Sequence, residues 1–123
     1  MGWANWSVNV YLLIIMSDYK NISPEQLKDK LKLKQEMMLI DVREPEEFEI
    51  CHITGSILVP LSEFVDHVDD FDKNTEYIVI CKDGDRSVEA IQILSKNGFL
   101  NLSNLEGGIY LWAKTVEKTM ELY

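Results

Sequence analysis

The stretch YIVICKDGDRS, residues 77–87, decides the fold of this chain. Its first four residues are apolar and mostly β-branched, which predicts a buried strand. A short polar loop follows, and residues 87–96 then carry apolar side chains at helical spacing, which predicts an amphipathic helix. A buried strand that leads through a short loop into a helix is typical of an α/β domain with a mostly parallel sheet.

Strands and helices also alternate on both sides of this stretch. Upstream, Ser23-Pro24-Glu25-Gln26 predicts a helix start, because serine caps a helix, proline suits its first turn and glutamine can bond back to the cap. Further strands are expected at residues 37–42, 57–59 and 102–105, further helices from Ser62 and at residues 109–118, and Gly98 is expected to end the helix at 87–96.

Length and charge narrow the classes of function. The chain has 123 residues, which suits one domain, and its formal net charge is −9. An acidic domain without a basic cluster is a poor partner for nucleic acid or an anionic membrane, so neither is expected. Two cysteines are too few for a disulfide scaffold or a cysteine-based zinc site, which favours a reducing compartment, here the cytoplasm.

The first 17 residues contain no charged side chain. Their apolar run at residues 10–16 is too short to span a membrane, and no basic region or cleavage site indicates a signal peptide. We therefore expect residues 1–17 to form an extension and residues 18–123 to form the domain.

Cys81 follows the strand predicted at residues 77–80, and its surroundings favour the thiolate form. It precedes a helix N-terminus, whose partial positive charge favours an anion. The loop can aim successive backbone N–H groups inward, Gly84 allows a tight curl, and Lys82 and Arg86 add positive charge. A thiolate in such a setting is a nucleophile. The alternative is an unreactive, buried cysteine.

The only two arginines of the chain, Arg43 and Arg86, both follow predicted strands. Parallel sheets bind ligands at the carboxyl ends of their strands, and arginine binds oxyanions through a bidentate fork. This favours a small anionic substrate, such as a sulfur oxyanion, beside Cys81. Asp83 and Asp85 offset these cations. They either face solvent or repel a divalent anion in favour of a protein or cationic acceptor, and the sequence leaves both open.

Three segments, in this order, resemble signatures of the rhodanese family, and they cover nearly all of residues 22–113. The first contains Leu39-Ile40-Asp41-Val42-Arg43, Glu47-Phe48, His52-Ile53, Gly55-Ser56 and Pro60; the second is Cys81-x-x-Gly84-x-Arg86-Ser87; the third contains Gly98-Phe99, Asn101-Leu102, Leu105, Gly107-Gly108 and Trp112. The resemblance implies a rhodanese-like α/β fold, with a central five-stranded parallel sheet and helices on both faces.

It also implies an enzyme similar to thiosulfate sulfurtransferase, without metal or cofactor. Thiosulfate or a protein persulfide loads the cysteine as a persulfide, and a thiol, cyanide or a sulfur-carrier protein then takes the sulfur. By the same resemblance, Arg86 braces the loop or meets the donor, Asp41 orients the loop, and Arg43 supplies charge or a structural ion pair. The implied site comprises Cys81 as the nucleophile, Lys82, Asp83, Gly84, Asp85, Arg86 and Ser87 as the loop that binds substrate and persulfide, and Asp41 and Arg43 as supporting residues.

One departure from the family pattern is Cys51, which stands where glycine commonly precedes the histidine. The run EICHI at residues 49–53 resembles rhodanese domains attached to enzymes that adenylate the sulfur carriers of molybdopterin and thiamine synthesis. Cys51 is therefore either a second thiol that resolves the persulfide or a small residue packed under the loop. His52 is either a general base or a residue that holds a turn.

Two rival functions remain. Phosphatases and arsenate reductases of related folds use Cys-x5-Arg, whereas Cys81 and Arg86 here have only four residues between them. The other rival is a non-catalytic interaction module, although such rhodanese-like modules lack the cysteine.

Overall fold

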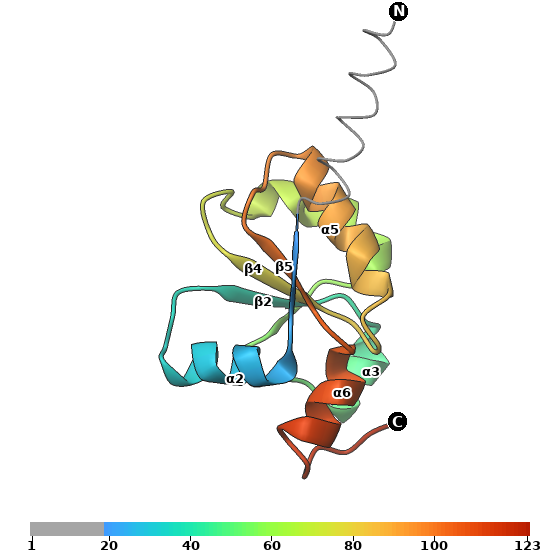
Figure 1. Cartoon of the computed structure of the whole chain (residues 1–123). Helices are drawn as coiled ribbons and strands as arrows, with labels where there is room; N and C mark the ends of the chain where they lie inside the picture. The colour runs from blue at the N-terminus through green and yellow to red at the C-terminus, as the bar shows by residue number, and fades with distance from the viewer. Residues whose placement is uncertain (1–18) are drawn as a thin grey trace, which may run out of the picture.

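The computed structural model describes residues 19–123, and its centre is a five-stranded parallel sheet with the strand order β1-β5-β4-β2-β3 (Figure 1). The strands are β1 (Lys20–Ile22), β2 (Met38–Asp41), β3 (Ile57–Leu58), β4 (Tyr77–Ile80) and β5 (Leu102–Leu105). The expected α/β fold is thus confirmed. The extension expected at residues 1–17 lies outside the described residues.

Helices cover both faces of the sheet. They are α2 (Pro24–Lys32), α3 (Pro45–Ile50), α4 (Phe64–His67), α5 (Arg86–Lys96) and α6 (Gly108–Thr115), and 3-10 turns at Leu61–Glu63 and Val68–Asp70 flank α4. Figure 1 shows α5 on one side of the sheet and α2 and α6 on the other. None of the helices in residues 19–123 combines the length and apolarity needed to cross a membrane.

The hydrophobic core has two layers because neighbouring residues of a strand face opposite sides of the sheet. Val79 of β4 packs with Phe64 of α4 and Leu94 of α5. Ile78, one residue earlier, belongs to the layer that contains Leu27 of α2 and Trp112 of α6. The central strand β4 is buried along its whole length, so its carboxyl end gives the loop after it a rigid base.

Local sequence signals explain several element boundaries. At the start of α2, Ser23 Oγ accepts a hydrogen bond from the Gln26 N–H and Gln26 Oε1 accepts one from the Ser23 N–H, as the capping pattern predicts. After α5, Gly98 adopts a φ of +87°, which suits its expected place past the helix end.

Three local predictions were wrong or incomplete. Ser62 lies within the 3-10 turn Leu61–Glu63 and caps no helix, since α4 begins at Phe64 without a side-chain cap. The last helix ends at Thr115, short of the expected residue 118. The sequence patterns also did not reveal β1 or α3.

Candidate active site

The Cys81 side chain is fully buried at the carboxyl end of β4, inside a loop that curls around its sulfur. The Gly84 N–H donates to Cys81 Sγ at 3.0 Å, so a backbone amide already faces the sulfur. Gly84 has a φ of +99°, and a Cβ at this position would lie 3.2 Å from the backbone nitrogen of Gly107. Glycine is therefore required here by both backbone conformation and space.

A buried polar cluster holds the loop from below. Ser87 Oγ lies 3.5 Å from Cys81 Sγ and 3.1 Å from the Gly84 carbonyl oxygen, and it is hydrogen-bonded to Asn104 Oδ1. Asn104 Nδ2 donates to the same Gly84 carbonyl and to Asn21 Oδ1, each at 3.2 Å. The cluster joins the loop to β1 and β5 and fixes where the sulfur sits.

Asn104 was not singled out by the sequence reasoning. Its signal was a pair of polar residues, Ser103 and Asn104, inside a strand that is otherwise apolar and fully buried. A buried polar side chain needs hydrogen-bond partners, and for Asn104 the loop supplies them.

The first turn of α6 packs directly against the loop backbone. The Ile109 N–H donates to the Cys81 carbonyl at 2.9 Å, and the Tyr110 N–H donates to the Lys82 carbonyl at 3.0 Å. Gly108 has a φ of +59°, and a Cβ there would lie 2.4 Å from the Cys81 carbonyl oxygen. Gly108 thus lets α6 approach the loop closely.

The amino end of α5 also faces the thiol, because Ser87 belongs to its first turn. The N-cap residue Asp85 makes no side-chain cap, so the partial positive charge of this helix end can stabilise an anion held at the loop. Asp83 is exposed, but its Oδ1 accepts from the Asp85 N–H at 3.1 Å and lies 3.9 Å from Cys81 Sγ. The Asp83 side chain therefore shapes the loop although it is exposed. The Asp85 side chain is exposed as well.

Arg86 is held by a carboxylate. Its guanidinium nitrogens lie 3.3 and 3.5 Å from the carboxylate oxygens of Glu47 on α3. Burial acts to raise the pKa of Glu47, but hydrogen bonds from Tyr123, from the Glu44 backbone N–H and from Arg86 outweigh it and lower that pKa to about 2. This contact favours the bracing role for Arg86 over direct contact with a donor.

Asp41 and Arg43 form a fully buried ion pair, with Arg43 Nη2 2.7 Å from Asp41 Oδ2. Within the described residues, every hydrogen bond of the Asp41 side chain goes to Arg43. The contacts of Asp41 therefore do not match its expected role in orienting the active loop. Arg43 also donates to the Cys51 carbonyl at 2.6 Å and to the Tyr123 hydroxyl at 3.1 Å. Of the two roles expected for Arg43, its contacts fit the structural ion pair.

Cys51 and His52 both have contacts that fit a structural role. Cys51 is a free, buried thiol that packs in the core layer of α2 and α6, whereas Cys81 packs in the opposite layer. His52 stacks on Phe48 with the ring centroids 3.9 Å apart, and its Nδ1 lies 2.8 Å from the Phe48 carbonyl oxygen. These bonds hold the turn after α3.

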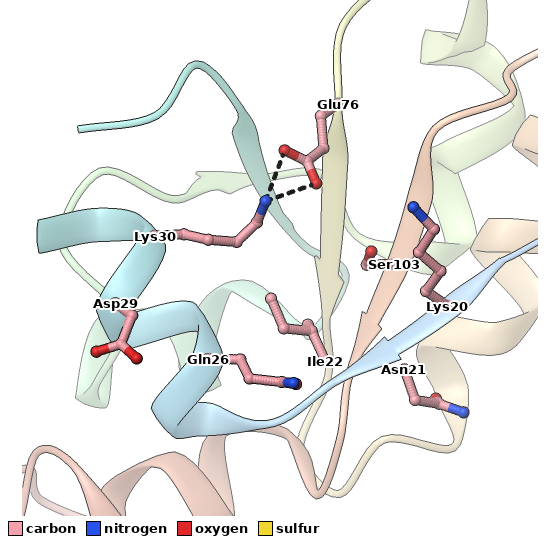
Figure 2. A pocket seen from close by; sticks show the side chains of 8 residues that line it. All are labelled: Lys20, Asn21, Ile22, Gln26, Asp29, Lys30, Glu76 and Ser103. Atoms are coloured by element: carbon pink, nitrogen blue, oxygen red, sulfur yellow. Dashed lines mark hydrogen bonds and ion pairs between the residues drawn. The ribbon is translucent and has the colours of Figure 1, made fainter. Parts of the chain in front are cut away.

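A separate pocket lies beside the edge strand β1, between β1 and α2 (Figure 2). Lys30 reaches across it to Glu76 at 3.1 Å. No cysteine or histidine lines this pocket, so it offers no nucleophile of the kind seen at Cys81. The pocket is lined by Lys20, Asn21, Ile22, Gln26, Asp29, Lys30, Glu76 and Ser103.

The geometry thus joins a buried sulfur, an inward-facing amide and an uncapped helix end at one carboxyl strand end. Comparison with known proteins assigns the chain to a family, since residues 23–115 match the model of the rhodanese-like domain. The chain belongs to the rhodanese-like domain family.

Three relatives illustrate the similarity. Probable adenylyltransferase/sulfurtransferase MoeZ of Mycobacterium tuberculosis is 36% identical over 104 residues, covering 83% of this chain but only 26% of MoeZ. Thiosulfate sulfurtransferase GlpE of Pseudomonas entomophila is 34% identical over 101 residues, covering 81% of this chain and 90% of GlpE. The crystal structure of a rhodanese-related protein from Thermoplasma volcanium superposes with a TM-score of 0.72 at 35% identity, covering 80% of this chain and 94% of that one.

Proposed function

We propose that this protein is a sulfurtransferase that carries sulfur as a persulfide on Cys81. The observation that carries the proposal is the loop geometry, in which the Gly84 N–H donates to Cys81 Sγ at 3.0 Å beside the uncapped start of α5. A persulfide anion needs this kind of environment, because backbone N–H groups and a helix N-terminus stabilise negative charge without bringing in a competing base.

The proposed reaction has two steps. The Cys81 thiolate attacks the outer sulfur of a donor such as thiosulfate, the sulfur–sulfur bond of the donor breaks, and sulfite leaves with the electron pair. An acceptor nucleophile then attacks the terminal sulfur of the persulfide, the new sulfur–sulfur bond breaks, and the Cys81 thiolate is restored. With cyanide as acceptor the product is thiocyanate, and no external oxidant or reductant is consumed.

Donor and acceptor are proposed from the relatives. The name of GlpE specifies thiosulfate, which supports a sulfur oxyanion as one donor; a protein persulfide is the alternative donor. The name of MoeZ includes sulfur transfer, and a Bacillus subtilis relative is named putative sulfur carrier protein YrkF, which supports a sulfur-carrier protein as one acceptor besides a thiol or cyanide. This chain spans about a quarter of MoeZ, so the adenylyl transfer itself is not proposed for it.

The experiment is a steady-state assay of thiocyanate formation from thiosulfate and cyanide. The wild-type protein and Cys51→Ser are expected to turn over, and Cys81→Ser is expected to be inactive. A Cys81→Ser variant that retains turnover would remove Cys81 from the proposal. Hydrolysis of an aryl phosphate by the wild type and not by Cys81→Ser would point to the phosphatase rival instead.

A further inference from the structure

Tyr123 lies over the active-site loop, although it is 42 positions away from Cys81 in sequence. Its hydroxyl accepts from Arg43 Nη1 at 3.1 Å. Its ring centroid lies 4.9 Å from Lys82 Nζ. Figure 1 shows this end of the chain beside α3 and α6, at the carboxyl edge of the sheet. Tyr123 thus connects the buried ion pair beneath the site to the outer face of the loop.

The charges around the loop make Lys82 distinctive. Arg86 is paired with Glu47, and Arg43 is buried against Asp41. Lys82 is exposed, and none of the ion pairs found in residues 19–123 includes it. Its positive charge is therefore not neutralised by a carboxylate, even though two aspartates follow it within three positions.

We propose that Tyr123 is a positioning residue that holds the Lys82 ammonium at the mouth of the loop, and thereby favours anionic reagents at Cys81. This inference deepens the proposed function, on which it rests, by assigning the choice of an anionic sulfur donor to a particular pair of side chains.

The ring and the hydroxyl have separate tasks. The aromatic face attracts the ammonium through its negative quadrupole. The hydroxyl fixes the ring by bonding to Arg43, which is itself anchored by Asp41 and the Cys51 carbonyl. Without the ring, Lys82 is free to turn towards Asp83 or Asp85, and the positive charge at the mouth is lost.

The test uses iodoacetate and iodoacetamide, which carry the same leaving group but differ in charge. The second-order rate of alkylation at Cys81 is measured for each reagent by peptide mass spectrometry, and their ratio reports attraction of an anion. Because both reagents need the same access to the sulfur, opening of the loop cancels in the ratio. Alkylation involves no sulfur transfer. This experiment can therefore fail while the proposed function stands, and the proposed function can fail while this experiment succeeds.

Tyr123→Leu is expected to lower the iodoacetate-to-iodoacetamide ratio about two- to five-fold, the factor set by a cation–π contact at an exposed site. Tyr123→Phe keeps the ring and is expected to keep most of the ratio. Lys82→Met is expected to lower the iodoacetate-to-iodoacetamide ratio at least as much as Tyr123→Leu does. The double variant is expected to have the same ratio as Lys82→Met alone. Lys114→Met removes an equal charge from α6 and controls for net charge.

Two results would overturn the inference. The first is an unchanged ratio in Tyr123→Leu. The second is a ratio that Tyr123→Leu lowers equally in the wild type and in Lys82→Met. The tyrosine would then act by some route other than the lysine.

Discussion

Gly108→Ala is expected to damage both the stability of the fold and the geometry of the active loop. The added Cβ would lie 2.4 Å from the Cys81 carbonyl oxygen and 2.6 Å from the Lys82 carbonyl carbon, and both are backbone atoms that cannot swing aside. The positive φ of +59° costs a non-glycine residue roughly 1–2 kcal/mol, and forced overpacking roughly 1–3 kcal/mol more. The sum predicts a loss of roughly 2–5 kcal/mol in the free energy of unfolding.

Gly55→Ala is a matched control for this variant. Gly55 also has a positive φ, +88°, but a Cβ there would meet nothing within 4 Å. It should therefore lose only the conformational part, roughly 1–2 kcal/mol. Urea unfolding of the two variants measures the difference, and alkylation of Cys81 by iodoacetamide reports on the loop. Equal losses in both variants, with unchanged Cys81 reactivity in Gly108→Ala, would refute the claim that α6 sets the loop by close packing.

Three further predictions concern the contacts around the loop. The pKa of Glu47 is lowered to about 2, so its stabilising contribution is present above about pH 4.5 and is lost as the pH falls towards 2. In urea unfolding, the free energy of unfolding of Glu47→Gln should therefore fall less than that of the wild type over this pH range. Arg86→Ala removes a half-exposed ion pair and should lose at most about 1 kcal/mol in the same assay. The variant should nevertheless load sulfur from thiosulfate more slowly than the wild type. Unchanged loading would leave Arg86 a purely structural role. Asn104→Leu removes one buried hydrogen-bond partner from the Ser87 hydroxyl and one from the Gly84 carbonyl, which then keep only each other and Cys81 Sγ. The variant should lose about 1–3 kcal/mol, whereas wild-type stability would remove Asn104 from the support of the loop.

Elements with strong local signals were predictable from the sequence. The buried strand β4, the capped start of α2 and the glycine after α5 each rest on a short run of residues whose chemistry leaves few choices. The edge strand β1 has only three residues, and its strand character comes from pairing with β5, which lies about 80 positions later. For α3 a signal was present and overlooked, because Glu44 and Glu47 form a capping box around Pro45.

The residues of the site also fall into those with a local sequence signal and those that depend on distant contacts. Cys81 and Gly84 could be placed from the loop sequence because their chemistry depends on immediate neighbours. Asn104 and Tyr123 depend on contacts between distant segments, and although the polar pair Ser103-Asn104 marks an unusual strand position, no local pattern names the partners. For Arg43 the sequence left two roles open, positive charge at the site or a structural ion pair. Its contact with Asp41, two residues away and fully buried, fits the ion pair.

The most direct test of the account is intact-mass spectrometry of the purified protein before and after incubation with thiosulfate, followed by cyanide. We expect a gain of one sulfur atom that maps to Cys81, is removed by cyanide, and is absent from Cys81→Ser. A gain that maps to Cys51, or no gain from either thiosulfate or a persulfide donor, would contradict the assignment of Cys81 as the sulfur carrier.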